Sequence, residues 1–266
     1  MKIIVCVKQV PDTSGKVAVN PDGTLNRASM AAITNPDDLN AVEAALQLKE
    51  QTGAEVVIIS MGPPPAEGML RECLARGCDR AVLVSGREFG GSDTYATSQI
   101  LAAAINKIGV DAEDIVMCGR QAIDGDTAQV GPQIAEKLGL PQISYAADIQ
   151  LDGNTVTVKR MLEDGYMTIK VQTPCLVTCI KELNEPRYMS VGGIFECYSK
   201  PYEVFDYEAL KDDPLIDKST IGLMGSPTNI LTSFTPPLKG AGMMLEGADR
   251  GTCEKLAELL AAKHLI

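Results

Sequence analysis

Short apolar segments alternate with helical patterns through the first half of the chain. The expected strands cover residues 2–10, 55–61, 81–84 and 115–118, and the expected helices cover residues 37–52, 66–76, 93–108 and 127–138. Helices that connect strands in this order cross over with a right hand and produce a parallel sheet with helices on both faces. The alternation therefore predicts an α/β fold built on a doubly wound, mostly parallel, Rossmann-like sheet.

From residue 143 onward the apolar residues recur at every second position. The segments 149–160 and 166–172 alternate in this way, and the pairs Asp152-Gly153 and Asp164-Gly165 have the composition of hairpin turns. A further strand is expected over residues 174–180. These segments predict an antiparallel hairpin edge on the parallel sheet.

The last part of the chain is expected to form an extended C-terminal arm. Residues 223–237 are rich in Pro, Gly, Ser, Thr and Asn, which is typical of a linker, and residues 251–265 have the pattern of an amphipathic helix. A tail with one helix cannot build a core of its own. We therefore expect a nucleotide-binding domain over residues 1–222 and an arm over residues 223–266 that packs on a partner chain.

Composition and charge narrow the class of protein. The net charge of −11 disfavours nucleic acid as a partner, and no apolar run reaches the roughly 18 residues of a membrane span. The start of the chain lacks a signal-peptide pattern, so a cytoplasmic location is expected. The eight cysteines include no Cys-x-x-Cys pair and the only histidine is His264, so no metal site is expected. Any redox chemistry must therefore come mainly from a bound cofactor.

The strongest candidate for a binding site is Met117-Cys-Gly-Arg-Gln-Ala-Ile-Asp-Gly-Asp-Thr-Ala-Gln-Val-Gly-Pro132. A short apolar strand leads into a polar loop, and a helix is expected to begin at Thr127. Free backbone N–H groups and the positive end of the helix dipole meet at such a junction and favour an anionic ligand. The segments 6–10, 35–38, 61–63 and 86–94 also follow expected strands. Because ligands bind beyond the carboxyl ends of parallel strands, we expect one shared nucleotide crevice.

Several short blocks together resemble the beta subunit of electron-transfer flavoproteins over nearly the whole chain. The last two blocks, joined by Pro174, resemble the diagnostic pattern of that family. The resemblance implies a heterodimer in which an alpha subunit carries the electron-transferring FAD on a mobile domain, and the beta C-terminus packs with that domain. The blocks are Val5-Cys-Val-Lys-Gln-Val-Pro11, Asn35-Pro36, Gly62-Pro63, Gly119-Arg-Gln-Ala-Ile-Asp124, Val158-Lys-Arg-Met-Leu-Glu163 with Gly165, and Asn184-Glu-Pro-Arg-Tyr188.

The resemblance also implies a second nucleotide in the crevice of the beta chain. In the housekeeping branch of the family it is AMP with a structural role. In the electron-bifurcating branch it is an FAD that NADH reduces, and the electrons go to an acyl-CoA dehydrogenase and to ferredoxin or flavodoxin. Residues 8–12 and 124–132 are similar to the bifurcating branch, and Gly125 leaves room for a larger ligand at the backbone. FAD is therefore the expected ligand, with AMP as the alternative.

The resemblance places the nucleotide against residues that follow several strands. Some of these residues also have interpretations that need no ligand. Residues 35–38 and Thr94 suit helix caps, and Cys6 and Met61 suit backbone contacts or core positions. Arg120 suits the role of an ordinary surface arginine. The full set is Cys6, Asn35, Pro36, Asp37, Asp38, Met61, Thr94, Gly119, Arg120, Gln121, Ala122, Ile123, Asp124, Gly125, Asp126, Thr127, Ala128, Gln129 and Val130.

A partner-docking loop is implied near residues 187–200, with Tyr188 and Val191 as its contact residues. The family presents a leucine at the position of Val191. Residues 87–91 suit either an NADH-contacting loop or a surface turn. Four charged residues of the diagnostic blocks are expected to form ion pairs that fix the hairpin and the subunit interface, and they are Arg160, Glu163, Glu185 and Arg187.

Overall fold

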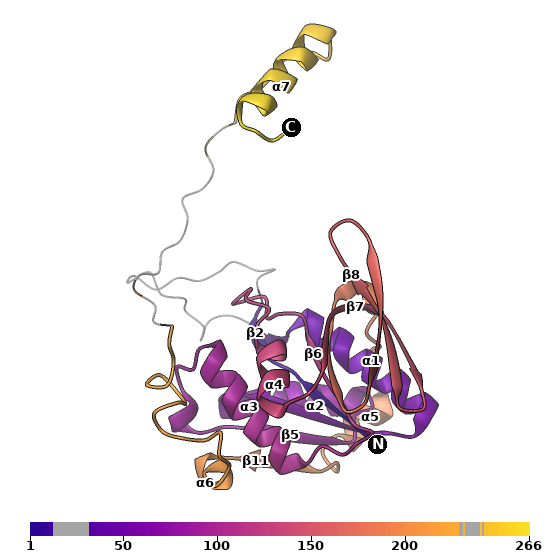
Figure 1. Ribbon diagram of the computed structural model, residues 1–266, viewed down its shortest axis with the longest axis vertical. Helices are drawn as coiled ribbons and strands as arrows, with labels where there is room; N and C mark the ends of the chain where they lie inside the picture. The colour runs from indigo at the N-terminus through magenta and orange to yellow at the C-terminus, as the bar shows by residue number, and fades with distance from the viewer. Residues whose placement is uncertain (13–31, 229–230, 232–239, 241) are drawn as a thin grey trace.

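The computed structural model describes residues 1–12, 32–228, 231, 240 and 242–266. Its centre is a nine-stranded sheet with the strand order β11-β5-β4-β1-β6-β10-β7-β8-β9 (Figure 1). Every neighbouring pair from β11 to β7 is parallel, whereas β8 is antiparallel to both β7 and β9. The predicted α/β fold with an antiparallel hairpin edge is confirmed.

The elements follow the predicted alternation closely. The strands are β1 (Lys2–Cys6), β2 (Gln9–Pro11), β3 (Ala32–Thr34), β4 (Glu55–Met61), β5 (Arg80–Val84), β6 (Ile115–Gly119), β7 (Gln142–Asp152), β8 (Thr155–Met161), β9 (Tyr166–Gln172), β10 (Cys175–Cys179) and β11 (Tyr202–Phe205). The helices are α1 (Pro36–Thr52), α2 (Glu67–Arg76), α3 (Thr94–Ile108), α4 (Val130–Leu138), α5 (Val191–Glu196), α6 (Tyr207–Leu210) and α7 (Arg250–Ala262).

Apolar clusters cover both faces of the parallel strands. Along β1, Ile3 and Val5 belong to a buried cluster that includes residues of α1 and α2. Ile4 and Cys6 belong to a second cluster that includes residues of α3 and α4. A strand that is buried on both faces needs apolar residues at successive positions. This explains why the first strands read as continuous apolar runs rather than as alternating patterns.

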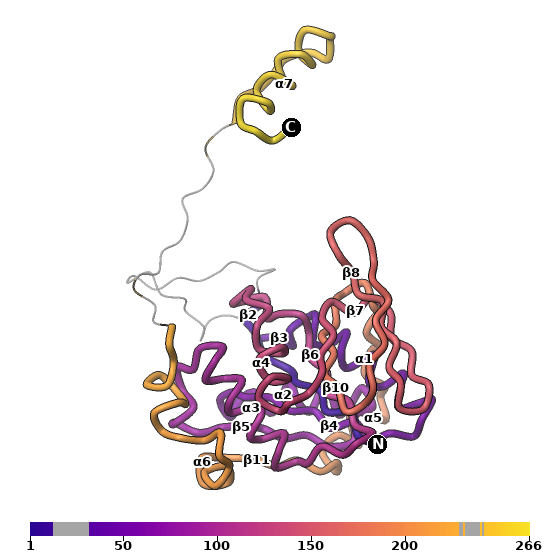
Figure 2. Tube along the Cα trace, viewed as in Figure 1, coloured from indigo at the N-terminus to yellow at the C-terminus, as the bar shows by residue number. Residues whose placement is uncertain are grey.

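The single strand expected over residues 2–10 is wrong. The ladder of β1 ends at Cys6, and β2 pairs with β3 in a separate antiparallel ribbon at the top of the body in Figure 2. The break falls at Lys8, whose backbone N–H donates to a carboxylate oxygen of Asp38 at 2.8 Å. That hydrogen bond takes the donor that a continuing ladder would need.

The strand expected over residues 174–180 forms, but it does not lie at the edge. β10 is inserted between β6 and β7 and is parallel to both. All five of its residues are buried, which suits an interior strand. The sheet also gains an unexpected edge strand, β11, which pairs in parallel with β5. Two of its four residues are exposed, so the sequence carries no clear strand pattern there.

The end of the chain contains the expected amphipathic helix. α7 begins after Asp249, whose side chain accepts a hydrogen bond from the N–H of Thr252, and no residue of α7 is buried. Most of the expected linker, residues 229–230 and 232–237, lies outside the described residues. Within the described ranges, no helix is both long and apolar enough to span a membrane.

Candidate functional site

A cavity of about 350 Å³ opens where β1, β4 and β6 end and where α3 and α4 begin. Its position agrees with the rule that ligands of parallel α/β sheets bind beyond the carboxyl ends of the strands. The structure brings thirteen of the expected site residues to its wall: Cys6, Asp38, Met61, Thr94, Gly119, Arg120, Gln121, Ala122, Gly125, Thr127, Ala128, Gln129 and Val130.

Other cavity residues were not expected from the sequence. They come mainly from the ends of β1 and β6 and from the first turn of α3. Six of them lie in blocks or segments that the sequence had pointed to, at residues 5–11, 86–94 and 117–132, but none was named there as a ligand contact. The unexpected residues are Val7, Lys8, Ser92, Asp93, Thr97, Leu101, Cys118 and Gly131.

Six expected residues do not line the cavity: Asn35, Pro36, Asp37, Ile123, Asp124 and Asp126. Asn35 instead holds the loop that does. Its Nδ2 donates to the carbonyl of Gln121 at 2.8 Å, and its Oδ1 accepts from the N–H of Ile123 at 3.1 Å. Asn35 precedes α1, but its side chain makes no capping hydrogen bond, so its interpretation as a side-chain cap is wrong. The two bonds to the loop use its amide group instead.

Asp38 connects the ends of two central strands. Its Oδ1 accepts from the N–H of Gly119 at 3.0 Å, and its Oδ2 accepts from the N–H of Lys8 at 2.8 Å. The carboxyl group is buried, and burial raises the pKa of Asp38 to about 7. Asp38 thus fixes the floor of the cavity, where β1 and β6 both give way to loops.

The loop after β6 is longer than expected. The helix predicted to begin at Thr127 begins at Val130, because Asp126 and Ala128 adopt left-handed φ values of 49° and 51°. A right-handed helix cannot pass through such residues. Residues 127–129 therefore stay in the loop, and Thr127, Ala128 and Gln129 lie along the wall of the cavity.

Two cations border the cavity, and each has a carboxylate beside it. Lys8 Nζ contacts both oxygens of Asp124, at 2.7 and 2.9 Å. Arg120 Nε lies 3.3 Å from Asp37 Oδ2. Burial raises the pKa of Asp37, although the Arg120 charge opposes that shift. The arrangement places positive charge at the cavity, where an anionic ligand would need it.

Thr94 faces the cavity and does not cap α3. The cap is Asp93, whose Oδ1 accepts from the N–H of Ala96 at 3.0 Å. The Thr94 hydroxyl donates instead to Gln129 Oε1 at 3.0 Å, which joins α3 to the loop after β6. On the floor, Cys6 and Cys118 are register partners on neighbouring strands. Burial raises the pKa of Cys6 to about 12, so this side chain is an uncharged thiol in the cavity wall.

The expected docking residues lie outside the cavity on an exposed surface. Tyr188 is 94% exposed and Val191 is 74% exposed. The chain before them is fastened to α1, because Arg187 forms ion pairs with Glu43 at 2.8 Å and with Glu50. Of the four residues expected to form ion pairs, Arg187 does so, whereas the described part of the chain shows no ion pair for Arg160, Glu163 or Glu185. α1 supplies the carboxylates for Arg187.

Replacing Lys8 with alanine is expected to weaken the binding of an anionic nucleotide about tenfold, because one charge-assisted hydrogen bond is lost. The free energy of unfolding should change by no more than about 1 kcal/mol, since the Lys8 side chain is 48% exposed. Titration calorimetry with AMP measures the first effect and chemical denaturation the second. Lys49→Ala removes a cation that pairs with Asp79 away from the cavity and is the matched control. Equal affinities for the two variants would exclude Lys8 from the site.

Comparison with known proteins identifies the family. A family model described as "Electron transfer flavoprotein domain" matches residues 22–209. The chain is 67% identical to the acryloyl-CoA reductase electron transfer subunit gamma of Anaerotignum propionicum and 50% identical to the caffeyl-CoA reductase-Etf complex subunit CarD of Acetobacterium woodii. It is 48% identical to the electron transfer flavoprotein subunit beta of Clostridium acetobutylicum, and all three alignments cover 100% of both chains. The resemblance seen in the sequence is confirmed: the chain belongs to the electron-transfer flavoprotein family as a beta-type subunit.

Proposed function

We propose that this chain is the beta subunit of an electron-bifurcating flavoprotein and that its cavity binds FAD. The observation that carries the nucleotide site is the cavity, with two cations, a long backbone loop and two helix N-termini at the carboxyl ends of parallel strands. The likeness of residues 8–12 and 124–132 to the bifurcating branch carries the choice of FAD. Two relatives with full-length alignments are named as parts of acryloyl-CoA reductase and caffeyl-CoA reductase systems. These names support a role in electron transfer to an acyl-CoA dehydrogenase.

The residues around the cavity fit a nucleotide. Backbone groups of Gly125 and of residues 127–129 and the hydroxyls of Thr97 and Thr127 suit a phosphate, and Lys8 and Arg120 supply charge. Leu101 and Val130 add apolar surface for a ring. A flavin, when bound, accepts hydride from NADH and passes on single electrons. The carboxylate oxygens of Asp38 and Asp93 already accept backbone N–H groups, so both side chains have a structural task in the cavity wall. The role of the protein side chains would therefore be to bind and orient the flavin.

AMP is the alternative ligand, and the cavity volume favours it. A volume of about 350 Å³ lies toward the lower end of the roughly 300–1,000 Å³ that is usual for ligand pockets. The whole of AMP suits such a space, whereas only part of FAD does. FAD remains our proposal because residues 8–12 and 124–132 resemble the bifurcating branch.

Three surfaces are proposed for the partners. α7 has no buried residue and belongs to the arm of residues 223–266, which we propose packs on the alpha subunit. The segment 187–200 exposes Tyr188, Val191, Phe195 and Tyr198, and we propose that it docks the acyl-CoA dehydrogenase. Residues 87–91 are proposed to contact NADH. Ferredoxin or flavodoxin is proposed as the second acceptor on the basis of the branch alone.

The nucleotide content of the purified heterodimer tests the proposal. The chain is co-expressed with its alpha subunit, and the nucleotides that heating releases are separated and quantified. We expect two FAD per heterodimer, and bleaching of a flavin when NADH is added. One FAD together with one AMP per heterodimer would overturn the assignment of FAD in favour of the housekeeping role.

A further inference from the structure

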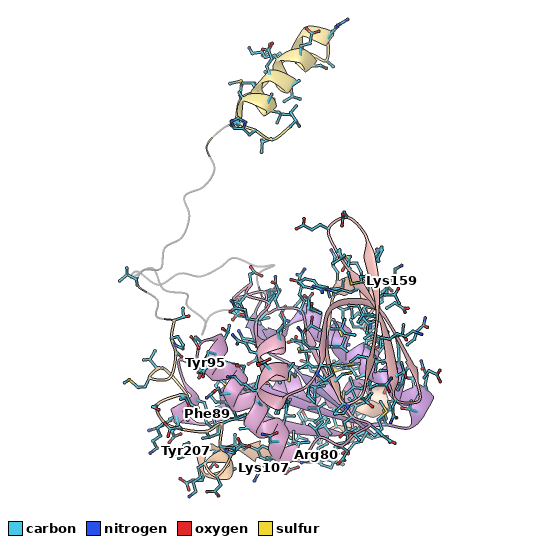
Figure 3. All side chains as sticks on the ribbon, in the orientation of Figure 1. Arg80, Phe89, Tyr95, Lys107, Lys159 and Tyr207 are labelled. Atoms are coloured by element: carbon cyan, nitrogen blue, oxygen red, sulfur yellow. The ribbon has the colours of Figure 1, made fainter. Side chains whose placement is uncertain are left out.

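The start of the proposed C-terminal arm is fastened to a loop that borders the cavity. We call residues 221–228 the arm root. The N–H of Leu223 donates to the carbonyl of Gly90 at 3.0 Å, and the hydroxyl oxygen of Ser226 accepts from the N–H of Asp93 at 2.8 Å. Ile221 and Phe89 belong to the same buried apolar cluster. Phe89 is labelled in Figure 3, on the side of the body where the arm root lies.

Asp93 belongs to both the arm root and the cavity. Its Oδ2 accepts from the N–H of Thr228 at 2.9 Å, while its Oδ1 caps α3 through the N–H of Ala96. Asp93 and its neighbours Ser92 and Thr94 line the cavity. Because Thr94 also bonds to Gln129, hydrogen bonds and the chain itself connect the loop after β6 to the arm root without a gap.

The charge of Asp93 determines whether docking of the arm root strengthens or weakens the binding of an anionic ligand. A carboxylate in the wall of a cavity repels an anionic ligand unless hydrogen-bond donors offset its charge. The backbone N–H of Thr228 is one of those donors, and it is available only when the arm root is docked. Undocking the root would therefore leave more negative charge facing the ligand.

We propose that the nucleotide cavity and the arm root are coupled through Asp93, so that docking of the root strengthens nucleotide binding and a bound nucleotide stabilises the docked root. The proposal rests on the nucleotide site proposed above. The two effects must be equal in size, because coupling between two binding equilibria is reciprocal.

The test removes the Thr228 donor without touching the cavity. Thr228→Pro deletes the backbone N–H, whereas Thr228→Ser keeps both the N–H and the hydroxyl and is the matched control. Thr228 is exposed and does not line the cavity. In the full chain with its alpha subunit, we expect Thr228→Pro to weaken the binding of FAD or AMP about fivefold or more, and Thr228→Ser to bind as the wild type does. Ser226→Ala, which removes the acceptor for the Asp93 N–H, gives a second variant and should act in the same direction.

Hydrogen exchange separates this proposal from the one on which it rests. We expect the nucleotide to slow amide exchange in residues 119–131 and also in residues 221–228, with the second effect lost in Thr228→Pro. Protection confined to residues 119–131, or equal affinities of Thr228→Pro and Thr228→Ser, would overturn the coupling and leave the nucleotide site intact. Protection of neither segment would overturn both proposals.

Discussion

Replacing Asp38 with alanine is expected to lower the free energy of unfolding by about 2–4 kcal/mol and to abolish nucleotide binding. The change leaves the N–H groups of Gly119 and Lys8 without the oxygens that accept them, and each unpaired buried donor costs about 1–3 kcal/mol. Because the same bonds hold the ends of β1 and β6 together at the floor of the cavity, the site should lose its shape. Chemical denaturation and nucleotide titration measure the two effects.

Asp38→Asn tests the titration of the Asp38 carboxyl, although the amide keeps only one of the two acceptor oxygens. Burial raises the pKa of the Asp38 carboxyl to about 7, against about 3.9 in an unfolded chain. Between about pH 4 and 7 the native protein therefore keeps a proton that the unfolded chain releases, so this contribution to stability is complete below pH 4 and is lost as the pH rises through 7. Asparagine does not titrate, and the slope of stability against pH should be flatter in Asp38→Asn over this range. Parallel slopes for wild type and variant would contradict the assignment.

The order of elements could be predicted from the sequence because burial imposes a period on the chain. The strand Glu55–Met61 was predicted with the bounds that the structure shows, since six apolar or small residues follow Glu55, and the first five of them are buried. Tyr202–Phe205 was missed for the opposite reason, because its two middle residues are exposed and it lies at the edge of the sheet. The place of β10 inside the sheet results from its pairing with β6. A local sequence pattern does not show which strands pair with each other.

The candidate site was predicted less completely, because its geometry depends on contacts between distant residues. Asn35 stands in a motif of the family, yet its partners Gln121 and Ile123 follow a different strand, so its role in holding the loop was hidden. The side chain of Lys8 is held at the cavity by Asp124, and these two residues are also far apart in the sequence. The left-handed φ of Ala128 was also invisible, because alanine is not a residue type that signals this conformation.

Gly119→Ala is expected to destabilise the protein by at least about 3 kcal/mol and to eliminate nucleotide binding. A Cβ atom at this position would lie 2.6 Å from the backbone carbon of Asp37 and 2.7 Å from the backbone nitrogen of Asp38. Both atoms belong to the first turn of α1, so they cannot move aside as the end of a flexible side chain can. The cost should therefore reach or exceed the usual range of about 1–3 kcal/mol for overpacking. Chemical denaturation of the full chain measures it.

Gly125→Ala is the matched control on the same loop, and it tests a different property. No atom lies within 4 Å of a Cβ at position 125, so the free energy of unfolding should change by no more than about 0.5 kcal/mol. Gly125 does line the cavity, so a methyl group at this position adds bulk to the cavity wall. If the bare backbone is needed for the nucleotide, Gly125→Ala should lose affinity while keeping its stability, whereas Gly119→Ala should lose both. An unchanged affinity in Gly125→Ala would show that the ligand approaches the loop elsewhere, and a stable Gly119→Ala would contradict the tight packing of β6 against α1.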